Sequence, residues 1–329
     1  MPYRVLVTRR MRPEAVSYLT DRGYEVKLIS SGDPVDPELL IREAEGCDGM
    51  IVQAEKVPAW VAERLPESIK VIGRHGVGFD SVDAAKLEEL GIILTNAPLS
   101  NIESVAEHTV MMIAALAKQL KRHDKDLAEA SYGRRLNAPY NIQLKGKTVG
   151  IIGVGKIGAL VARKCRYGFD MNVIGYDAIL PKERFPEEVE YAATLDELYA
   201  RADFVTPHMP LLESNTYMFD KAAFAKMKST AFFINTSRGK MCREDDLYEA
   251  LINGQIAGAA IDVWDPEPPQ LDNPLLKLGN VILSPHMAGN TYEAEIAMGI
   301  DAARGVDEVL SGKPVTWQVN HPGVPRAHR

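Results

Sequence analysis

Residues 148–177 read TVGIIGVGKIGALVARKCRYGFDMNVIGYD, and this stretch decides the fold of the chain. It opens with a run of β-branched residues, which is typical of a strand buried in a parallel sheet. Three glycines follow in the spacing G-x-G-x-x-G, at Gly153, Gly155 and Gly158. In that spacing the first glycine permits a tight turn, the second lets the backbone approach a pyrophosphate, and the third lets a helix pack on the strand. The stretch therefore predicts a dinucleotide-binding βαβ unit.

The residues after the glycines indicate which dinucleotide is bound. Apolar residues recur at helical spacing, so the amides of Lys156 and Ile157 are expected at a helix N-terminus that faces the phosphates. Gly168 is expected to end this helix, and a second predicted strand then leads to Asp177, which lies 177 − 158 = 19 residues beyond the last glycine. A carboxylate there accepts hydrogen bonds from the ribose hydroxyls and repels a 2′-phosphate, which favours NAD over NADP. The alternatives are a plain structural turn and another nucleotide binder, such as a methyltransferase.

Length, charge and cysteine content narrow the class of protein. At 329 residues the chain is long for one core, so two lobes are expected. A net charge of −7 argues against nucleic acid or an anionic membrane as the main partner. The longest apolar stretch, 110–117, is too short to span a bilayer. Cys47, Cys165 and Cys242 form no C-x-x-C pair, which indicates a reducing compartment, and a cytoplasmic location is expected.

Predicted strands and helices alternate along the chain, which is typical of an α/β protein. We expect two Rossmann-like, doubly wound parallel-sheet domains, the smaller built from both chain ends, because no strand of the nucleotide lobe follows the last helix, 291–310. Residues 1–101 plus 292–329 are the predicted flavodoxin-like substrate domain. Residues 102–291 are the predicted NAD-binding Rossmann domain, with about six strands.

A long apolar helix is predicted to begin the second domain. Ser100 and Glu103 have the spacing of a capping box, and apolar residues follow at helical spacing. Because the middle of this helix is apolar nearly all round, we expect it to link the two lobes or to enter a subunit interface. The polar stretch 131–146 connects it to the central strand and is a candidate arm.

Three side chains able to carry chemistry follow predicted strands of the large lobe. Arg238 offers a planar fork of donors for a carboxylate or carbonyl, and His286 titrates near neutral pH. Glu267 is placed to orient the imidazole. Since parallel strands end at one edge of a sheet, these three residues are expected to converge near the glycine turn, as a hydride-transfer dehydrogenase requires.

Each of these residues has an ordinary structural alternative. A loop arginine is usually a surface residue, Glu267 among prolines is compatible with a simple turn, and a histidine after proline is more often structural than catalytic. No metal site is expected, because no His, Cys or Asp group has ligand spacing on one element.

Beyond the glycine turn, the motifs along nearly the whole chain resemble those of the D-isomer-specific 2-hydroxyacid dehydrogenases. They are GRHGVGFDSVD (73–83), SVAEHT (104–109), HMPLLESNT (208–216), NTSRG (235–239), DVWDPEP (262–268) and SPHMAGNT (284–291). The resemblance implies hydride transfer between NAD and an (R)-2-hydroxy acid or its 2-oxo form. It also implies a homodimer formed through the nucleotide-binding domain.

The resemblance also implies roles for individual residues. Arg238, Glu267 and His286 would be catalytic, and the amides of Val77 and Gly78 would hold the substrate carboxylate together with Arg238 and His286. The residues expected to contact the cofactor are Gly153, Gly155, Lys156, Ile157, Gly158, Asp177, Met209, Thr236, Asp262 and Ala288.

Two departures bear on the substrate. At the place where phosphoglycerate enzymes have a sequence that resembles V-R-S-x, this chain has Val52-Gln53-Ala54-Glu55. A basic partner for a substrate phosphate is therefore missing. No regulatory domain follows residue 329 in this sequence. A small unphosphorylated acid, such as hydroxypyruvate or glyoxylate, is therefore favoured. The alternative function is an NAD-sensing binding protein without catalysis, because related corepressors use this scaffold.

Overall fold

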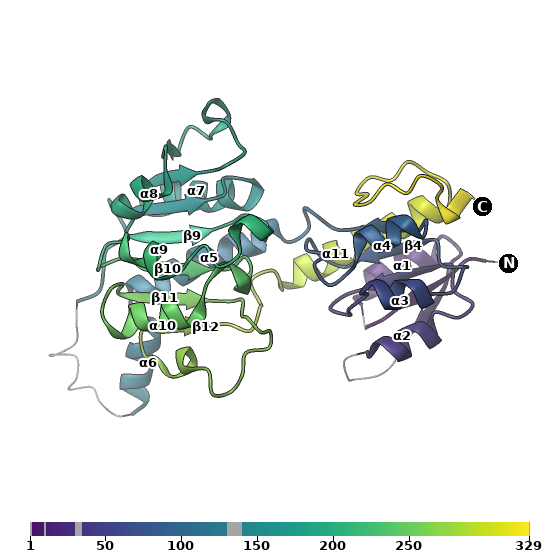
Figure 1. Cartoon of the computed structure of the whole chain (residues 1–329), viewed down its shortest axis with the longest axis horizontal. Helices are drawn as coiled ribbons and strands as arrows, with labels where there is room; N and C mark the ends of the chain where they lie inside the picture. The colour runs from purple at the N-terminus through teal and green to yellow at the C-terminus, as the bar shows by residue number, and fades with distance from the viewer. Residues whose placement is uncertain (1, 10, 30–34, 130–139, 329) are drawn as a thin grey trace. The chain divides into compact units, whose positions relative to one another are not determined.

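The computed structural model describes residues 2–9, 11–29, 35–129 and 140–328. The chain divides into two compact units, and Figure 1 shows the elements of both. The small unit comprises residues 1–101 and 290–329, and the large unit comprises residues 102–289. The candidate arm falls largely on residues 130–139, which lie outside the described residues.

The small unit is a parallel sheet with strand order β2-β1-β3-β4-β5, the order of flavodoxin-like folds. Its strands are β1 (Arg4–Val7), β2 (Glu25–Leu28), β3 (Gly49–Val52), β4 (Val71–Arg74) and β5 (Ile93–Thr95). Its helices are α1 (Pro13–Thr20), α2 (Pro37–Glu43), α3 (Ala59–Arg64), α4 (Ala84–Glu89), α11 (Tyr292–Leu310) and the short η6 (Arg326–His328). Helices α1 and α11 pack on one face, and α2, α3 and α4 pack on the other. The small unit is thus built from both chain ends, as predicted.

The large unit is a seven-stranded sheet with order β12-β11-β10-β9-β6-β7-β8, in which every printed pairing is parallel. Its strands are β6 (Thr148–Ile152), β7 (Asn172–Tyr176), β8 (Glu190–Tyr191), β9 (Phe204–Pro207), β10 (Phe232–Asn235), β11 (Gly258–Ile261) and β12 (Val281–Leu283). Its α-helices are α5 (Ile102–Ala117), α6 (Leu120–Ala128), α7 (Lys156–Phe169), α8 (Leu195–Arg201), α9 (Lys221–Ala225) and α10 (Glu244–Ile252). Its 3-10 helices are η2 (Lys182–Arg184), η3 (Glu213–Asn215), η4 (Gly239–Met241) and η5 (Pro274–Lys277). The strand order reverses between β6 and β9, where such sheets bind ligands beyond the strand ends.

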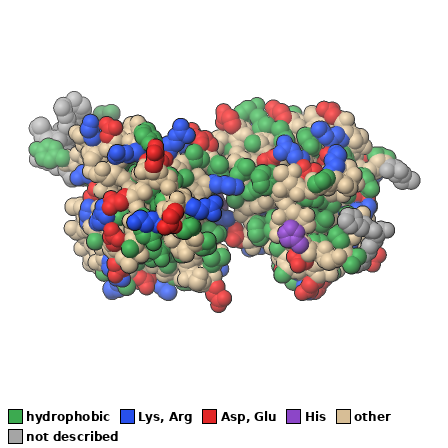
Figure 2. Space-filling view, turned by 90° about the horizontal axis from the view of Figure 1, so that it is seen from above, with side chains coloured by type: hydrophobic (Ala, Val, Ile, Leu, Met, Phe, Trp, Pro, Cys, Tyr) green, Lys and Arg blue, Asp and Glu red, His purple; other side chains and the backbone are tan. Residues whose placement is uncertain are grey.

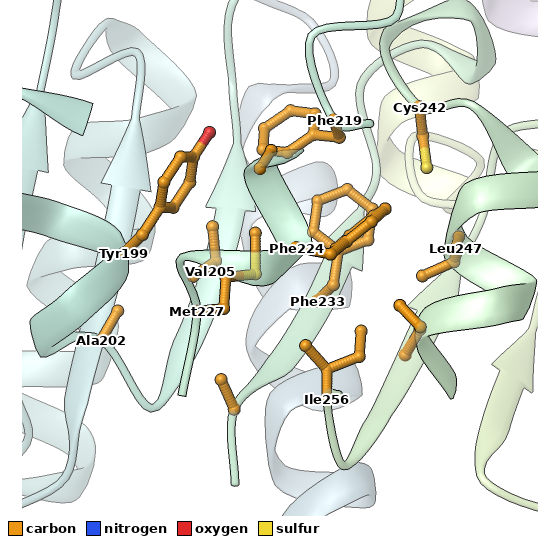
Figure 3. Packing of buried hydrophobic residues seen from close by; sticks show 14 of the residues in the cluster. Tyr199, Ala202, Val205, Phe219, Phe224, Met227, Phe233, Cys242, Leu247 and Ile256 are labelled. Carbon is orange, nitrogen blue, oxygen red and sulfur yellow. The ribbon is translucent and has the colours of Figure 1, made fainter. Parts of the chain in front are cut away.

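Helices cover both faces of the large sheet. Helices α5 and α7 share one buried cluster with the sheet, and α8, α9 and α10 share the other. Figure 3 shows the second cluster, where Phe219, Phe224 and Phe233 pack around one another with ring centroids 4.7 and 5.5 Å from the ring of Phe233. All three rings are fully buried, so this cluster rigidly anchors the segments on either side of Phe219.

Three details of the sequence interpretation were wrong. The large sheet has β8 in addition to the expected six strands, because a two-residue edge strand carries no periodic signal. Gly168 does not end α7, which continues to Phe169 and closes with Asp170 in the left-handed conformation at φ +52°. Ser100 is not the N-cap of a capping box with Glu103, because α5 begins at Ile102 and Ser100 lies one residue before the N-cap position; its hydroxyl donates to Asp301 of α11 at 2.6 Å.

The surface carries both signs of charge. On the face seen in Figure 2, lysine and arginine side chains are interspersed with aspartates and glutamates. Within the described ranges, none of the helices has the length and apolar character needed to cross a membrane.

Candidate active site

The turn between β6 and α7 has the glycine geometry that the sequence predicts. Gly153 has φ +92°, and a Cβ there would lie 2.9 Å from the carbonyl carbon of His208. A Cβ on Gly158 would lie 2.2 Å from the carbonyl oxygen of Gly153, so the helix packs directly on the turn. A Cβ on Gly155 would meet nothing within 4 Å. The open space therefore lies over Gly155, just before α7 begins at Lys156, where a pyrophosphate would approach the N-terminus of the helix.

Asp177 follows β7 and has its carboxylate fixed by the backbone. One carboxylate oxygen accepts from the amide of Val154 at 2.9 Å. The other accepts from the amides of Ile179 and Leu180, both at 2.9 Å. The first contact ties Asp177 to the glycine turn, so its negative charge stands beside the expected phosphate site. This placement fits recognition of ribose hydroxyls, for which carboxylate lone pairs remain.

The loops after β10, β11 and β12 lie together at one edge of the sheet. The amide of Asp262 donates to Asn235 at 3.0 Å, and the amide of His286 donates to the carbonyl of Asp262 at 2.7 Å. A Cβ on Gly239 would lie 2.0 Å from the carbonyl oxygen of Trp264, so the first loop packs against the second. The indole of Trp264 donates to Ser284 at 3.0 Å. The segments that carry the three predicted catalytic residues are therefore neighbours.

His286 and Glu267 form a direct pair. The imidazole Nδ1 lies 2.6 Å from Glu267 Oε1, and the two side chains are 47% and 40% exposed. With Nδ1 directed to the carboxylate, the proton to be exchanged is on Nε2, at the other side of the ring. The pair can therefore orient a general acid or base.

The backbone of His286 is held in a strained conformation by Asp262. His286 has φ +57°, in the left-handed region that non-glycine residues rarely adopt. The carboxylate of Asp262 is fully buried and accepts from the amides of Met287 at 2.8 Å and Ala288 at 3.0 Å. It thereby fixes the turn that presents the imidazole. The sequence interpretation assigned Asp262 only to the cofactor and missed this structural role, which depends on a contact across two strands.

The other residues predicted to contact the cofactor lie on the same unit. Thr236 follows β10, is buried, and shares a hydrogen bond of 2.9 Å with Thr109 of α5. Met209 follows β9 and packs against the aromatic cluster. Arg238 is half-buried, and its Nη1 donates to the carbonyl of Ser237 at 2.8 Å. The sequence did not predict the contact of Thr109 with Thr236, although Thr109 is the last residue of the SVAEHT motif.

The predicted substrate-binding amides belong to the small unit. Val77 and Gly78 follow β4 and are half-buried. The carbonyl of Val77 accepts from the Asn96 side chain at 2.8 Å, and the carbonyl of Gly76 accepts from the Ala97 amide at 3.0 Å. These contacts fix the turn from the β5 side. The assignment of its amides to a substrate carboxylate stays a prediction. Among the described residues, no group of three or more His, Cys, Asp or Glu side chains is arranged to hold a metal ion.

Residues 110–288 match the family model described as "D-isomer specific 2-hydroxyacid dehydrogenase, NAD binding domain". The chain is also 34% identical over 305 residues to the glyoxylate reductase of Korarchaeum cryptofilum, with 91% of this chain and 90% of that protein covered. The chain belongs to the D-isomer specific 2-hydroxyacid dehydrogenase family. The family predicted from the motifs, and NAD as the cofactor of this family member, are thereby confirmed.

This 2-hydroxyacid dehydrogenase family member has further relatives of different length. It is 36% identical over 322 residues to the D-3-phosphoglycerate dehydrogenase of Archaeoglobus fulgidus, with 98% of this chain and 60% of that protein covered. The chain thus spans between 50% and 60% of the length of the phosphoglycerate dehydrogenases it matches. The solved structure of D-2-hydroxyisocaproate dehydrogenase superposes with a TM-score of 0.84 at 26% identity, covering 97% of this chain and 100% of that one. The predicted fold class is confirmed.

Proposed function

We propose that the protein is an NAD-dependent D-2-hydroxyacid dehydrogenase in which the large unit binds the cofactor and the small unit contributes to substrate binding. The observation that carries the proposal is the 2.6 Å contact between His286 and Glu267 on the sheet edge that also bears the glycine turn. A histidine oriented by a carboxylate is the arrangement that proton exchange with a substrate hydroxyl or carbonyl requires. The family membership supports the same reaction class.

The proposed division of labour follows from the chemistry of each group. When bound, NAD would provide the hydride acceptor or donor for the reaction. Through Nε2, His286 takes the proton from the substrate hydroxyl during oxidation, or gives it to the carbonyl oxygen during reduction. Glu267 holds the Nδ1 side of the ring, and Arg238 binds substrate oxygens through its planar fork. The buried Asp262 keeps the turn at His286 in place.

We propose a small unphosphorylated 2-oxo acid as substrate, with hydroxypyruvate and glyoxylate as the first candidates. In the small unit, the carboxylate of Glu55 is buried near Gln53 and accepts from its amide at 2.6 Å. The same carboxylate binds Arg9 Nε at 2.6 Å and the hydroxyl of Thr8 at 2.7 Å. A buried negative charge at this position, with a nearby arginine already paired to it, disfavours a phosphate group.

The test is NADH oxidation, followed by absorbance, with a panel of 2-oxo acids that includes the phosphorylated acid corresponding to phosphoglycerate. We expect turnover with an unphosphorylated acid, a lower kcat/KM with the phosphorylated one, and a lower rate with NADPH. No turnover with any acid and either cofactor would reject the proposal. Tight NADH binding in that case would favour the NAD-sensing alternative. Preference for the phosphorylated acid would overturn the substrate class alone.

We further propose a cytoplasmic homodimer formed through the large unit. A groove of about 690 Å³ between α5 and α7 is lined by both apolar and charged side chains, and among the apolar ones Met111 is 48% and Tyr167 is 63% exposed. Exposed apolar surface of this kind is typical of interfaces. Light scattering should give the mass of two chains, and Met111→Glu should reduce it to the mass of one chain.

The buried thiols of Cys47, Cys165 and Cys242 agree with the proposed reducing compartment.

A further inference from the structure

One carboxylate outside the His286–Glu267 pair holds both ends of the segment that carries Glu267. Glu244 lies in the first turn of α10, and its Oε1 accepts from the amide of Asp265 at 2.8 Å. Its Oε2 accepts from the side-chain amide of Asn273 at 2.5 Å. Asp265 and Asn273 are the two ends of the segment 265–273, which we call the Glu267 loop. Glu244 therefore joins the two ends of this loop to each other and to a helix.

A second side chain holds the first end of the Glu267 loop. The hydroxyl of Tyr217 donates to the carboxylate of Asp265 at 2.6 Å. The amide of Tyr217 donates to the carbonyl of Lys240 at 2.7 Å, and Phe219, two residues later, is fully buried in the aromatic cluster. The Tyr217 ring also lies 4.8 Å from the guanidinium of Arg243. The hydroxyl is thus presented from a rigid base rather than from a mobile segment.

Packing contributes little to the position of the Glu267 loop. Residues 266–272 include no buried side chain, and Leu271 is 94% exposed. A cavity of about 370 Å³ lies against the loop, lined in part by Tyr217, Glu244 and Gln270. Without apolar burial, the place of the loop depends on its hydrogen bonds. Burial raises the pKa of Glu244, and the hydrogen bonds from Asp265 and Asn273 counter that shift.

We propose that Glu244 and Tyr217 are positioning residues for the reaction, acting through Glu267. This inference rests on the proposed function. Glu267 is 40% exposed and its contact with His286 is 2.6 Å, so the contact holds only while the loop stays in place. Displacement of a catalytic group by about 1 Å is enough to cost on the order of 100-fold in rate. Neither Glu244 nor Tyr217 needs to touch substrate or cofactor to have this effect.

The test compares Glu244→Gln and Tyr217→Phe with Asp245→Asn in the full chain. Glutamine keeps the shape of Glu244 but leaves one of the two donors without an acceptor, and phenylalanine removes only the hydroxyl. Asp245 is the exposed next residue, lines the same cavity, and serves as the matched control for loss of a charge. With the 2-oxo acid identified by the panel, we expect kcat to fall about tenfold in Glu244→Gln and a few-fold in Tyr217→Phe, and to stay unchanged in Asp245→Asn. The Kd for NADH, measured by fluorescence, should stay unchanged in all three.

Two further readouts separate positioning from a general loss of structure. In a Glu267→Gln background, Glu244→Gln should cause no further loss of kcat, because both changes act through the same side chain. Amide hydrogen exchange of peptides covering residues 265–273 should be faster in Glu244→Gln and in Tyr217→Phe than in the wild type, and unchanged in Asp245→Asn.

The outcomes distinguish this inference from the proposed function. If the wild type shows no turnover, the proposed function fails, and this inference fails with it. If the wild type turns over and Glu244→Gln and Tyr217→Phe keep its kcat, only this inference is overturned. Additive losses in the double variant, or exchange in the Glu267 loop that matches the wild type, would also overturn it. If Glu244→Gln does not fold, Tyr217→Phe alone decides by the same measurements.

Discussion

The imidazole Nδ1 of His286 lies 2.6 Å from the Oε1 atom of Glu267, although the two residues stand on loops that follow different strands. The imidazole comes from the turn after β12, and the carboxylate comes from the Glu267 loop after β11. Because β11 and β12 are paired in parallel, their carboxyl ends meet at one edge, and the pair forms across them. The proposed chemistry of the protein depends on this contact.

Removal of the imidazole should abolish most turnover without loss of cofactor binding. In His286→Ala we expect kcat to fall by roughly 10²–10⁴-fold, the usual contribution of a general acid or base. Glu267→Gln should cause a smaller fall, because the ring remains but loses its charged partner. Both are measured by NADH absorbance, with NADH affinity by fluorescence as the control. A His286→Ala variant with wild-type kcat would remove His286 from the mechanism.

Two glycine substitutions, one in the turn and one in the first turn of α7, should have different effects. Gly155→Ala places its methyl group in open space, so the fold should be retained while the Kd for NADH rises by at least about tenfold. Gly158→Ala would bring its Cβ to 2.2 Å from a carbonyl oxygen, so it should lower the midpoint of thermal unfolding. Circular dichroism and NADH fluorescence measure the two effects. Unchanged NADH binding in Gly155→Ala would argue against a pyrophosphate at this turn.

Asp177 should set the preference for NADH. Replacement by asparagine removes the negative charge but keeps one oxygen, which can accept from the amides of Ile179 and Leu180 and leaves the amide of Val154 without this acceptor. We expect the ratio of kcat/KM for NADH to that for NADPH to fall about tenfold, since repulsion of the 2′-phosphate is lost. The thermal midpoint of Asp177→Asn shows whether the turn itself has survived. An unaltered ratio would place the discrimination on another residue.

His208 should make the folded protein less stable in acid. Burial lowers the pKa of His208 to about 3, below the ordinary value of ~6.5. Between these two pH values the unfolded chain binds a proton on this imidazole that the folded chain does not. The free energy of unfolding therefore falls as the pH falls through this window, by at most about 1.4 kcal/mol per pH unit from this residue.

The comparison is urea unfolding of the wild type and His208→Gln at pH 7 and pH 5. The wild type should lose more stability than the variant over this interval, by about 1–2 kcal/mol. At pH 7 the imidazole is neutral in both states, so the two proteins should differ mainly by packing around Thr206, whose hydroxyl lies 3.1 Å from the ring. Equal losses in acid would show that His208 is not the residue responsible.

Local patterns were sufficient for the nucleotide-binding turn. The spacing of Gly153, Gly155 and Gly158 and the acid at Asp177 are requirements of a short segment, and they are met within one βαβ unit. The alternation of strands and helices also followed from periodicity and turn residues, because hydrophobic spacing is a local property. Strand β8 was not predicted, because a two-residue edge strand is too short to show hydrophobic periodicity.

Contacts between distant segments required the structure. Ser100 has the spacing of a cap yet donates to Asp301, which lies 201 residues away along the chain. In the sequence, Glu244 is an ordinary acidic residue in the first turn of a helix. In the structure it accepts hydrogen bonds from both ends of the Glu267 loop, and no periodicity in the sequence predicts that this loop lies beside α10.

The sequence by itself determined the α/β class, the family and the identity of the side chains that carry the proposed chemistry, because these depend on residue type and on spacing within short segments. Only the tertiary structure decided that Asp262 is buried beneath the turn of His286 and that Glu244 joins both ends of the Glu267 loop. The physical reason is that both roles are hydrogen bonds between segments that become neighbours only when parallel strands pair and their ends reach one edge.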